Sequence, residues 1–116
     1  MKHARLADMV KGWFVGNFEP AALHSAECEV AVKHYRAGDR EALHYHRVAT
    51  EITVVVSGTV RMMSRTWQAG DIITIEPGEA TEFEALTDAI NVVVKLPSQT
   101  DDKFVGSPPG YRHVTA

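Results

Sequence analysis

Short runs of Val, Ile and Thr alternate with turn signals along most of this chain. Turn signals separate the runs, among them "AGD" at 37–39 and 69–71, "SGT" at 57–59 and "EPGE" at 76–79. Helical periodicity is scarce, and only Arg5–Val10 and Pro20–Glu27 fit a turn or two of helix. The pattern therefore predicts an all-β sandwich or barrel. The strands are expected near Gly12–Phe18, Glu29–Tyr35, Leu43–His46, Ile52–Val56, Thr59–Ser64, Asp71–Ile75, Thr81–Leu86 and Asn91–Lys95.

Size and composition narrow the class of protein. A chain of 116 residues predicts one domain, residues 1–116, whose Pro-rich C-terminal tail is either irregular and packed on the barrel or partly disordered. The net charge is −3 and no block of basic residues occurs, which argues against a nucleic-acid partner. No apolar run is long enough to span a membrane, no signal peptide is visible, and the single cysteine, Cys28, excludes an intrachain disulfide. We therefore expect a cytoplasmic protein without membrane contact.

The segment "GDREALHYHRVATEITVVVSG" carries the candidate chemistry. Residues two apart on a strand share a face, so His44 and His46 are expected to point the same way. Glu51 begins the next predicted strand and can lie opposite them. Two imidazoles and a carboxylate in this arrangement form a facial metal site for Fe, Mn, Ni or Zn. The competing interpretation is that both histidines are surface residues of an edge strand.

The same segment resembles the first motif of the cupin family, G-x5-H-x-H-x3,4-E-x6-G. It matches from Gly38 through His44, His46 and Glu51 to Gly58. The resemblance covers about residues 29–96. It implies a double-stranded β-helix, or jelly-roll barrel, with His44, His46 and Glu51 as ligands of a divalent transition metal.

The second cupin motif is degenerate between Gly70 and Ala85. Glu76 stands at the usual proline position, Ala85 replaces the asparagine, and Thr81 replaces the histidine that normally supplies a fourth metal ligand. A threonine hydroxyl is a poor ligand for these metals. Three outcomes follow: three protein ligands, a fourth ligand from elsewhere, or no metal.

His34 is the leading candidate for a further functional group. In "EVAVKH", Val30, Val32 and His34 share a face, and if the valines face the core then His34 lines the interior. We expect His34, Thr81 and Phe83 to line the pocket, and His34 and Glu51 to be candidate catalytic groups. Glu76 either reaches the mouth of the barrel or is solvated.

Three functions remain open. The first is a metal-binding enzyme of the isomerase, lyase or oxygenase type acting on a sugar-like or hydroxy or keto acid substrate. The second is a metal-free sugar isomerase or epimerase that uses histidine and carboxylate as acid and base. The third is a non-catalytic module that binds a small ligand. We also expect a homodimer, because a small barrel has open sheet edges and the predicted strand at 12–18 is rich in aromatic residues.

Overall fold

The computed structural model describes residues 1–110 and contains two β-sheets and one turn of 3-10 helix, Leu6–Asp8. The strands are β1 (Trp13–Gly16), β2 (Leu23–His24), β3 (Glu29–Tyr35), β4 (Arg40–Tyr45), β5 (Thr50–Ser57), β6 (Thr59–Met62), β7 (Arg65–Gln68), β8 (Ile72–Ile75), β9 (Thr81–Ala85), β10 (Ala89–Leu96) and β11 (Phe104–Val105). The predicted all-β class is confirmed.

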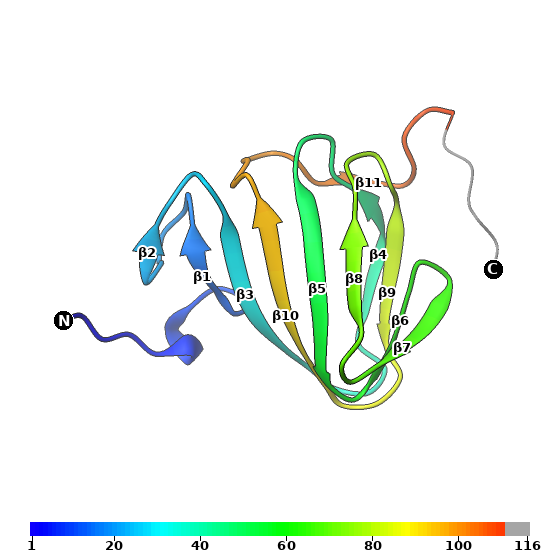
Figure 1. Ribbon diagram of the computed structural model, residues 1–116, viewed down its shortest axis with the longest axis horizontal. Helices are drawn as coiled ribbons and strands as arrows, with labels where there is room; N and C mark the ends of the chain where they lie inside the picture. Colours follow the sequence, from blue (N-terminus) through cyan, green and yellow to red (C-terminus); the bar gives the residue numbers. More distant parts are fainter. Residues whose placement is uncertain (111–116) are drawn as a thin grey trace.

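The two sheets enclose a barrel (Figure 1). One sheet has six strands in the order β2-β1-β3-β10-β5-β8, and the other has five in the order β11-β4-β9-β6-β7. All pairs except β1 with β2 are antiparallel. Consecutive strands such as β4 and β5 lie in opposite sheets, which is how a jelly-roll chain crosses between its layers.

Most predicted strands are present with small changes at their ends. The segment at 20–27 is wrong as a helix, because Leu23–His24 instead forms β2 beside β1. The pattern also missed β7, which closes a hairpin with β6 through Met63 and Ser64, both with positive φ. The described part of the tail contributes β11, which pairs with β4, and the expectation for residues 111–116 lies outside the described residues.

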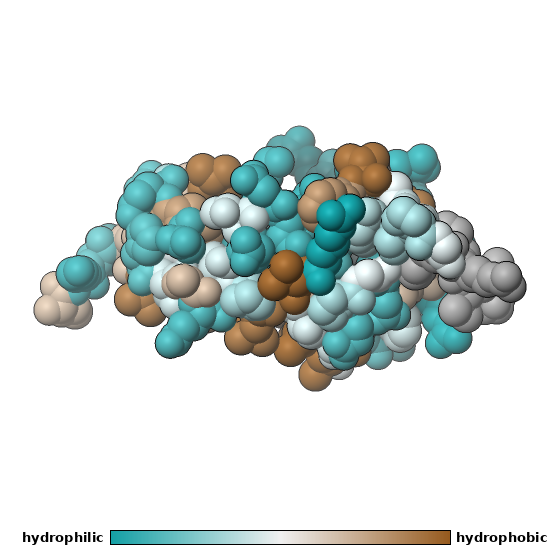
Figure 2. Space-filling model, turned by 90° about the horizontal axis from the view of Figure 1, so that it is seen from above, coloured by the Kyte–Doolittle hydropathy of each residue, from teal (hydrophilic) through white to brown (hydrophobic). Residues whose placement is uncertain are grey.

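The interior is divided between an apolar end and a polar end. The apolar core consists of Val55, Val60, Met62, Ile73, Ile75, Phe83, Ala85 and Ala89. Toward the other end of the same strands the inward positions become polar: Glu51 and Thr53 precede Val55 on β5, and Asn91 follows Ala89 on β10. The end of the barrel where β10 finishes and β5 begins is mostly hydrophilic from outside (Figure 2). The apolar end supplies the hydrophobic stabilisation, and the polar end is free to form a site.

The outer face of the six-stranded sheet is apolar. Two ladders of paired residues cross it, Val32–Val92–Val54–Ile72 and Val30–Val94–Ile52–Thr74. These even-numbered positions lie opposite the odd-numbered ones that line the interior. Val30 and Val32 therefore face outward, and the expectation that they face the core is wrong.

Gly12 fixes how β1 enters this sheet. Its φ is +81°, and a Cβ added there would lie 2.0 Å from the Val32 carbonyl oxygen. The Gly12 carbonyl accepts a hydrogen bond of 3.1 Å from the Val32 N–H. Only glycine allows this approach, which brings Trp13 over the interior opposite Ala31. Among residues 1–110, no helix has the length and apolar character needed to cross a membrane.

Candidate functional site

The polar end of the barrel encloses a cavity of about 160 Å³. His44, His46, Glu51, Thr81 and Phe83 all line it. The histidines come from β4 and the residue after it, in the five-stranded sheet, and Glu51 comes from β5 in the facing sheet. The predicted ligands thus face one cavity from opposite sheets rather than from neighbouring paired strands.

The two imidazoles are buried, with His44 and His46 each 7% exposed. Nδ1 of His44 lies 2.8 Å from the carbonyl oxygen of Ala42. Because a carbonyl only accepts, Nδ1 is the donor in this contact, which leaves Nε2 as the nitrogen that can bind a metal. The rings are edge to face, with centroids 5.6 Å apart. Two imidazoles that share one metal have centroids roughly 5 Å apart, given metal–nitrogen distances of about 2.1 Å, so a small movement would suffice.

Burial sets the protonation of two members of this site. Burial, the positive charge of Lys95 and the neighbouring His44 together lower the pKa of His46 to about 4. His46 is therefore neutral at pH 7, the form that binds a metal. Burial also raises the pKa of Glu51, against the opposing effects of Lys95 and His44. The hydroxyl of Thr53 donates a long hydrogen bond of 3.4 Å to Glu51 Oε2.

Two imidazoles and a carboxylate are suitable ligands for a divalent metal, but the three groups lie too far apart in this structure to bind one together. Within residues 1–110, no three side chains of His, Cys, Asp or Glu lie close enough together to hold a metal ion. The separation of the two imidazole rings is compatible with a shared metal, but no third potential ligand among the described residues lies close enough to complete the set. Thr81 would not complete the set, because its Oγ1 donates to the Glu82 carbonyl at 2.7 Å and accepts from the Met63 N–H at 3.1 Å.

The expectation that His34 lines the same interior is not met. His34 is exposed on the outer face of β3 and lines a neighbouring, more open cavity of about 680 Å³ instead. Its neighbours Lys33 and Tyr35 take the inward positions. The sequence left the phase of β3 ambiguous because valines occupy one face and Ala31 the other. Glu76 is exposed and does not line the site cavity.

A register shift in β4 brings a residue into the cavity that the sequence did not indicate. Glu41 pairs with Phe83 and His44 with Thr81, so one extra residue lies between them. Glu41 and His44 therefore face the same cavity although they are three positions apart. Strict alternation could not have found this.

Other cavity residues were also missed at the sequence level, namely Lys11, Trp13, Lys33, Tyr35, Thr53, Asn91, Val93 and Lys103. One of them had a usable signal. Asn91 is a single amide in the apolar run "AINVVV", and a polar residue within a buried strand calls for a partner. The scattered lysines carried no such signal, because only the tertiary structure brings them together.

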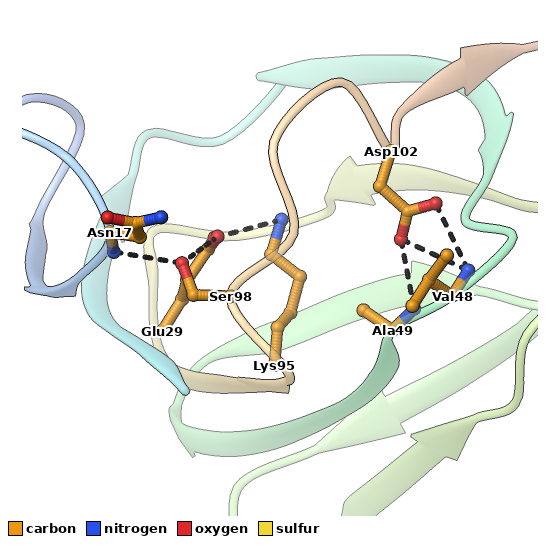
Figure 3. A network of polar contacts seen from close by, with 7 residues as sticks. All are labelled: Asn17, Glu29, Val48, Ala49, Lys95, Ser98 and Asp102. Atoms are coloured by element: carbon orange, nitrogen blue, oxygen red, sulfur yellow. Dashed lines mark hydrogen bonds and ion pairs between the residues drawn. The ribbon is translucent and has the colours of Figure 1, made fainter. Parts of the chain in front are cut away.

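A buried carboxylate fixes the loop that joins the two histidines to Glu51. Asp102 is 6% exposed and accepts hydrogen bonds of 2.9–3.2 Å from the backbone N–H groups of Arg47, Val48 and Ala49. Figure 3 shows the contacts with Val48 and Ala49. The C-terminal segment therefore acts as a clamp on the loop 46–49. This clamp holds His46 and the start of β5 at the cavity.

No protein-family model and no curated protein matches the chain. Solved structures do. An uncharacterised conserved protein with a double-stranded β-helix domain from Klebsiella pneumoniae has a TM-score of 0.67 and 22% identity, over 74% of this chain and 75% of that one. An RmlC-like cupin from Shewanella frigidimarina has a TM-score of 0.60 and 20% identity, over 66% and 71%. The DMSP lyase DddQ from Ruegeria pomeroyi has a TM-score of 0.65 and 19% identity, over 85% and 52%.

These similarities cover 66–85% of this chain. Together with the complete first motif from Gly38 to Gly58, they identify the architecture. The chain has the cupin fold, a double-stranded β-helix.

Proposed function

We propose that this cavity binds a divalent transition metal through His44, His46 and Glu51 and acts on a small sugar-like or hydroxy or keto acid substrate. The main support for this proposal is that the three side chains line one cavity from opposite sheets. Nδ1 of His44 is anchored on the Ala42 carbonyl, an arrangement typical of metal-binding histidines.

The protein's own residues would orient the substrate and exclude water. A bound metal would act as a Lewis acid that polarises a substrate oxygen, in isomerase, lyase or oxygenase chemistry. Phe83 and Met62 form the apolar floor of the cavity, and Trp13 lies at its wall. A floor of this kind keeps water away from the reacting atoms, which strengthens the electrostatic interactions there. The lyase among the structural neighbours is consistent with this class of reaction.

Metal analysis of untagged protein tests the proposal. The chain is reconstituted with Fe(II), Mn(II), Ni(II) or Zn(II), dialysed, and assayed for metal by mass spectrometry. Wild type should retain close to one equivalent of a preferred metal, and His44→Ala and His46→Ala should lose it. His34→Ala is the matched control, because His34 lies on the outer face and its variant should bind like wild type. Equal retention by wild type and His46→Ala, or no retention by either, would overturn the metal site.

A metal-free acid–base function is the second candidate. It is favoured by the observation that no three potential ligands approach closely within residues 1–110. In that case Glu51 and the histidines opposite it would transfer protons directly to and from the substrate. This candidate would be favoured over the first if the protein remained active on its substrate after a chelator had removed all metal, and if the Glu51→Gln variant lost that activity.

A further inference from the structure

Most of the lysines of this acidic chain line one cavity. The chain has a net charge of −3 and five lysines: Lys2, Lys11, Lys33, Lys95 and Lys103. All except Lys2 line the site cavity. They come from four places, before β1, in β3, in β10 and before β11, so no local sequence pattern produces the cluster. We call these four residues the cavity lysines.

The carboxylates that line the cavity do not neutralise all of the cavity lysines. Among residues 1–110 only one cavity lysine has an ion pair, between Lys95 Nζ and Glu29 Oε1 at 3.4 Å (Figure 3). Apart from the paired Lys95, three lysines line the cavity beside two glutamates, Glu41 and Glu51. Positive charge is therefore in excess there, and a bound divalent metal would increase it further.

Two of the ammonium groups share one aromatic ring. Lys33 Nζ lies 5.1 Å and Lys95 Nζ 4.7 Å from the centroid of the Trp13 ring. Cation–π contact of this kind holds the charges at the cavity wall. Burial lowers the pKa of Lys33, Glu41 opposes this, and the charges of Lys11, Lys95 and Lys103 lower it further. Like charges gathered in this way are costly in the absence of an anion.

An unpaired acceptor lies in the same cavity. Asn91 is 1% exposed, lines the cavity from β10, and its Oδ1 is buried without a hydrogen-bond partner. Leaving such an atom unpaired costs about 1–3 kcal/mol. A ligand hydroxyl that donates to this oxygen would remove that cost.

We propose that the cavity binds a small hydroxylated dicarboxylate, with cavity lysines binding its two carboxylates and Asn91 accepting a hydrogen bond from its hydroxyl. The proposal rests on the small-molecule site described above and specifies its substrate class. Lys33 and Lys95 lie in the six-stranded sheet, whereas Lys103 precedes β11 of the other sheet. Separated charges of this kind fit two carboxylates better than one compact anion. A cavity of about 160 Å³ is similar in volume to one of about 150 Å³ that binds benzene, so it limits the ligand to a small molecule such as a short diacid.

Calorimetric titration with defined anions tests this proposal. The probes are malate, succinate (which lacks the hydroxyl), lactate (which has one carboxylate) and inorganic phosphate. We expect malate to bind about tenfold or more tightly than lactate and several-fold more tightly than succinate. Affinity for malate should fall as salt is raised. Equal affinity for malate and lactate, tighter binding of phosphate than of malate, or no binding of any probe would overturn the proposal.

Matched variants assign the effect to the named residues. Lys33→Met and Lys103→Met should each weaken malate binding about tenfold, whereas Lys2→Met, the lysine outside the cavity, should not change it. Asn91→Leu, or Asn91→Ala if the first does not fold, should bind malate and succinate equally. A loss of affinity in Lys2→Met equal to that in Lys33→Met would contradict the role of the cavity lysines.

The same titrations separate this proposal from the metal site. They are run on protein as purified and after loading with Mn(II), and repeated with His46→Ala. If the metal site is wrong but the substrate class is right, no metal binds and the preference for malate over lactate persists in wild type. If metal binds and the anions are not distinguished, the substrate class is wrong and the metal site stands.

Discussion

Thr81 lies directly opposite His44 in the pairing of β4 with β9. The resemblance to the second cupin motif implies a histidine at this position, and the structure shows what the threonine does instead. Its hydroxyl bridges two strands through the Met63 N–H and the Glu82 carbonyl. The side chain that would be a fourth ligand is thus used to hold the β6–β7 hairpin.

We expect Thr81→His to strengthen metal binding. The new imidazole would enter the cavity beside His44, where a volume of about 160 Å³ leaves room for it. An imidazole as the fourth protein ligand, beside His44, His46 and Glu51, should raise the affinity for the metal by about tenfold or more. Competition with a chromophoric chelator measures the change. Thr81→Val is the control that removes the hydroxyl without adding a ligand, and an affinity gain in both variants would show that the imidazole is not responsible.

Loss of the Asp102 carboxylate should destabilise the loop between the histidines and Glu51. Asp102→Ala leaves the N–H groups of residues 47–49 without their acceptor, and we expect a loss of about 2–4 kcal/mol in the free energy of unfolding. Urea denaturation measures it. Asp102→Asn keeps one acceptor oxygen and should lose less, and Asp101→Asn at the exposed neighbour should be neutral. Wild-type stability in Asp102→Ala would refute the clamp.

Lys33 should lower the stability of the free protein at neutral pH. Burial lowers its pKa below the ordinary 10.5; Lys11, Lys95 and Lys103 act in the same direction, and Glu41 opposes them. Between the folded and unfolded pKa values the unfolded chain binds more protons, so stability from this group rises with pH through that window. The cost of the buried charge is fully present below the folded pKa and disappears as the pH passes the unfolded value.

Lys33→Met keeps the apolar stem and removes the charge, so it should raise the melting temperature at pH 7. The difference from wild type should narrow as the pH approaches 10.5. Thermal unfolding at pH 7 and pH 10 measures both effects, with Lys2→Met as the control. A melting temperature for Lys33→Met that is equal to or below that of wild type at pH 7 would contradict this account.

We propose that the chain forms a homodimer through the outer face of its six-stranded sheet. The two ladders of paired residues across this face contain no charged side chain, and Ile72 in the edge strand β8 is 65% exposed. Uncharged apolar surface of this kind favours association. Sedimentation equilibrium should show a dimer for wild type and a monomer for Val54→Asp. His34→Asp adds a charge at the end of β3 on the same face and should weaken the dimer less than Val54→Asp does. A monomeric wild type at micromolar concentration would exclude the dimer.

The pattern of the sequence was sufficient for the fold and for part of the site. Runs of β-branched residues between Gly-containing turns predicted the strands, and the spacing from Gly38 to Gly58 predicted that His44, His46 and Glu51 belong together. Both inferences depend on local rules: strands alternate faces, and turns need glycine or its substitutes. The structure brings these three residues to one cavity without bringing them into contact distance for a metal.

The direction in which β3 faces could not be decided from the sequence. An apolar side is normally expected to face the core, and that expectation points Val30, Val32 and His34 inward. In this barrel the polar side of β3 faces inward near the site: Lys33 and Tyr35 line a polar cavity, and the valines lie on the outer face of the sheet. Alternation along β3 allows either set of side chains to face inward, so only the pairing of β3 with β10 and β1 decides which set does.

The sequence by itself therefore determined the all-β class, most of the strands and the histidine–glutamate segment, since each is set by residues close together in the chain, and the resemblance to the cupin motif implied the jelly roll. Tertiary structure alone decided the contents of the cavity. Lys11, Lys33, Lys95 and Lys103 are far apart in sequence and meet only when the two sheets close around Asn91. A register shift in β4 adds Glu41, and the tail returns to place Asp102 under the loop. Such contacts depend on how distant strands pair, which no local pattern specifies.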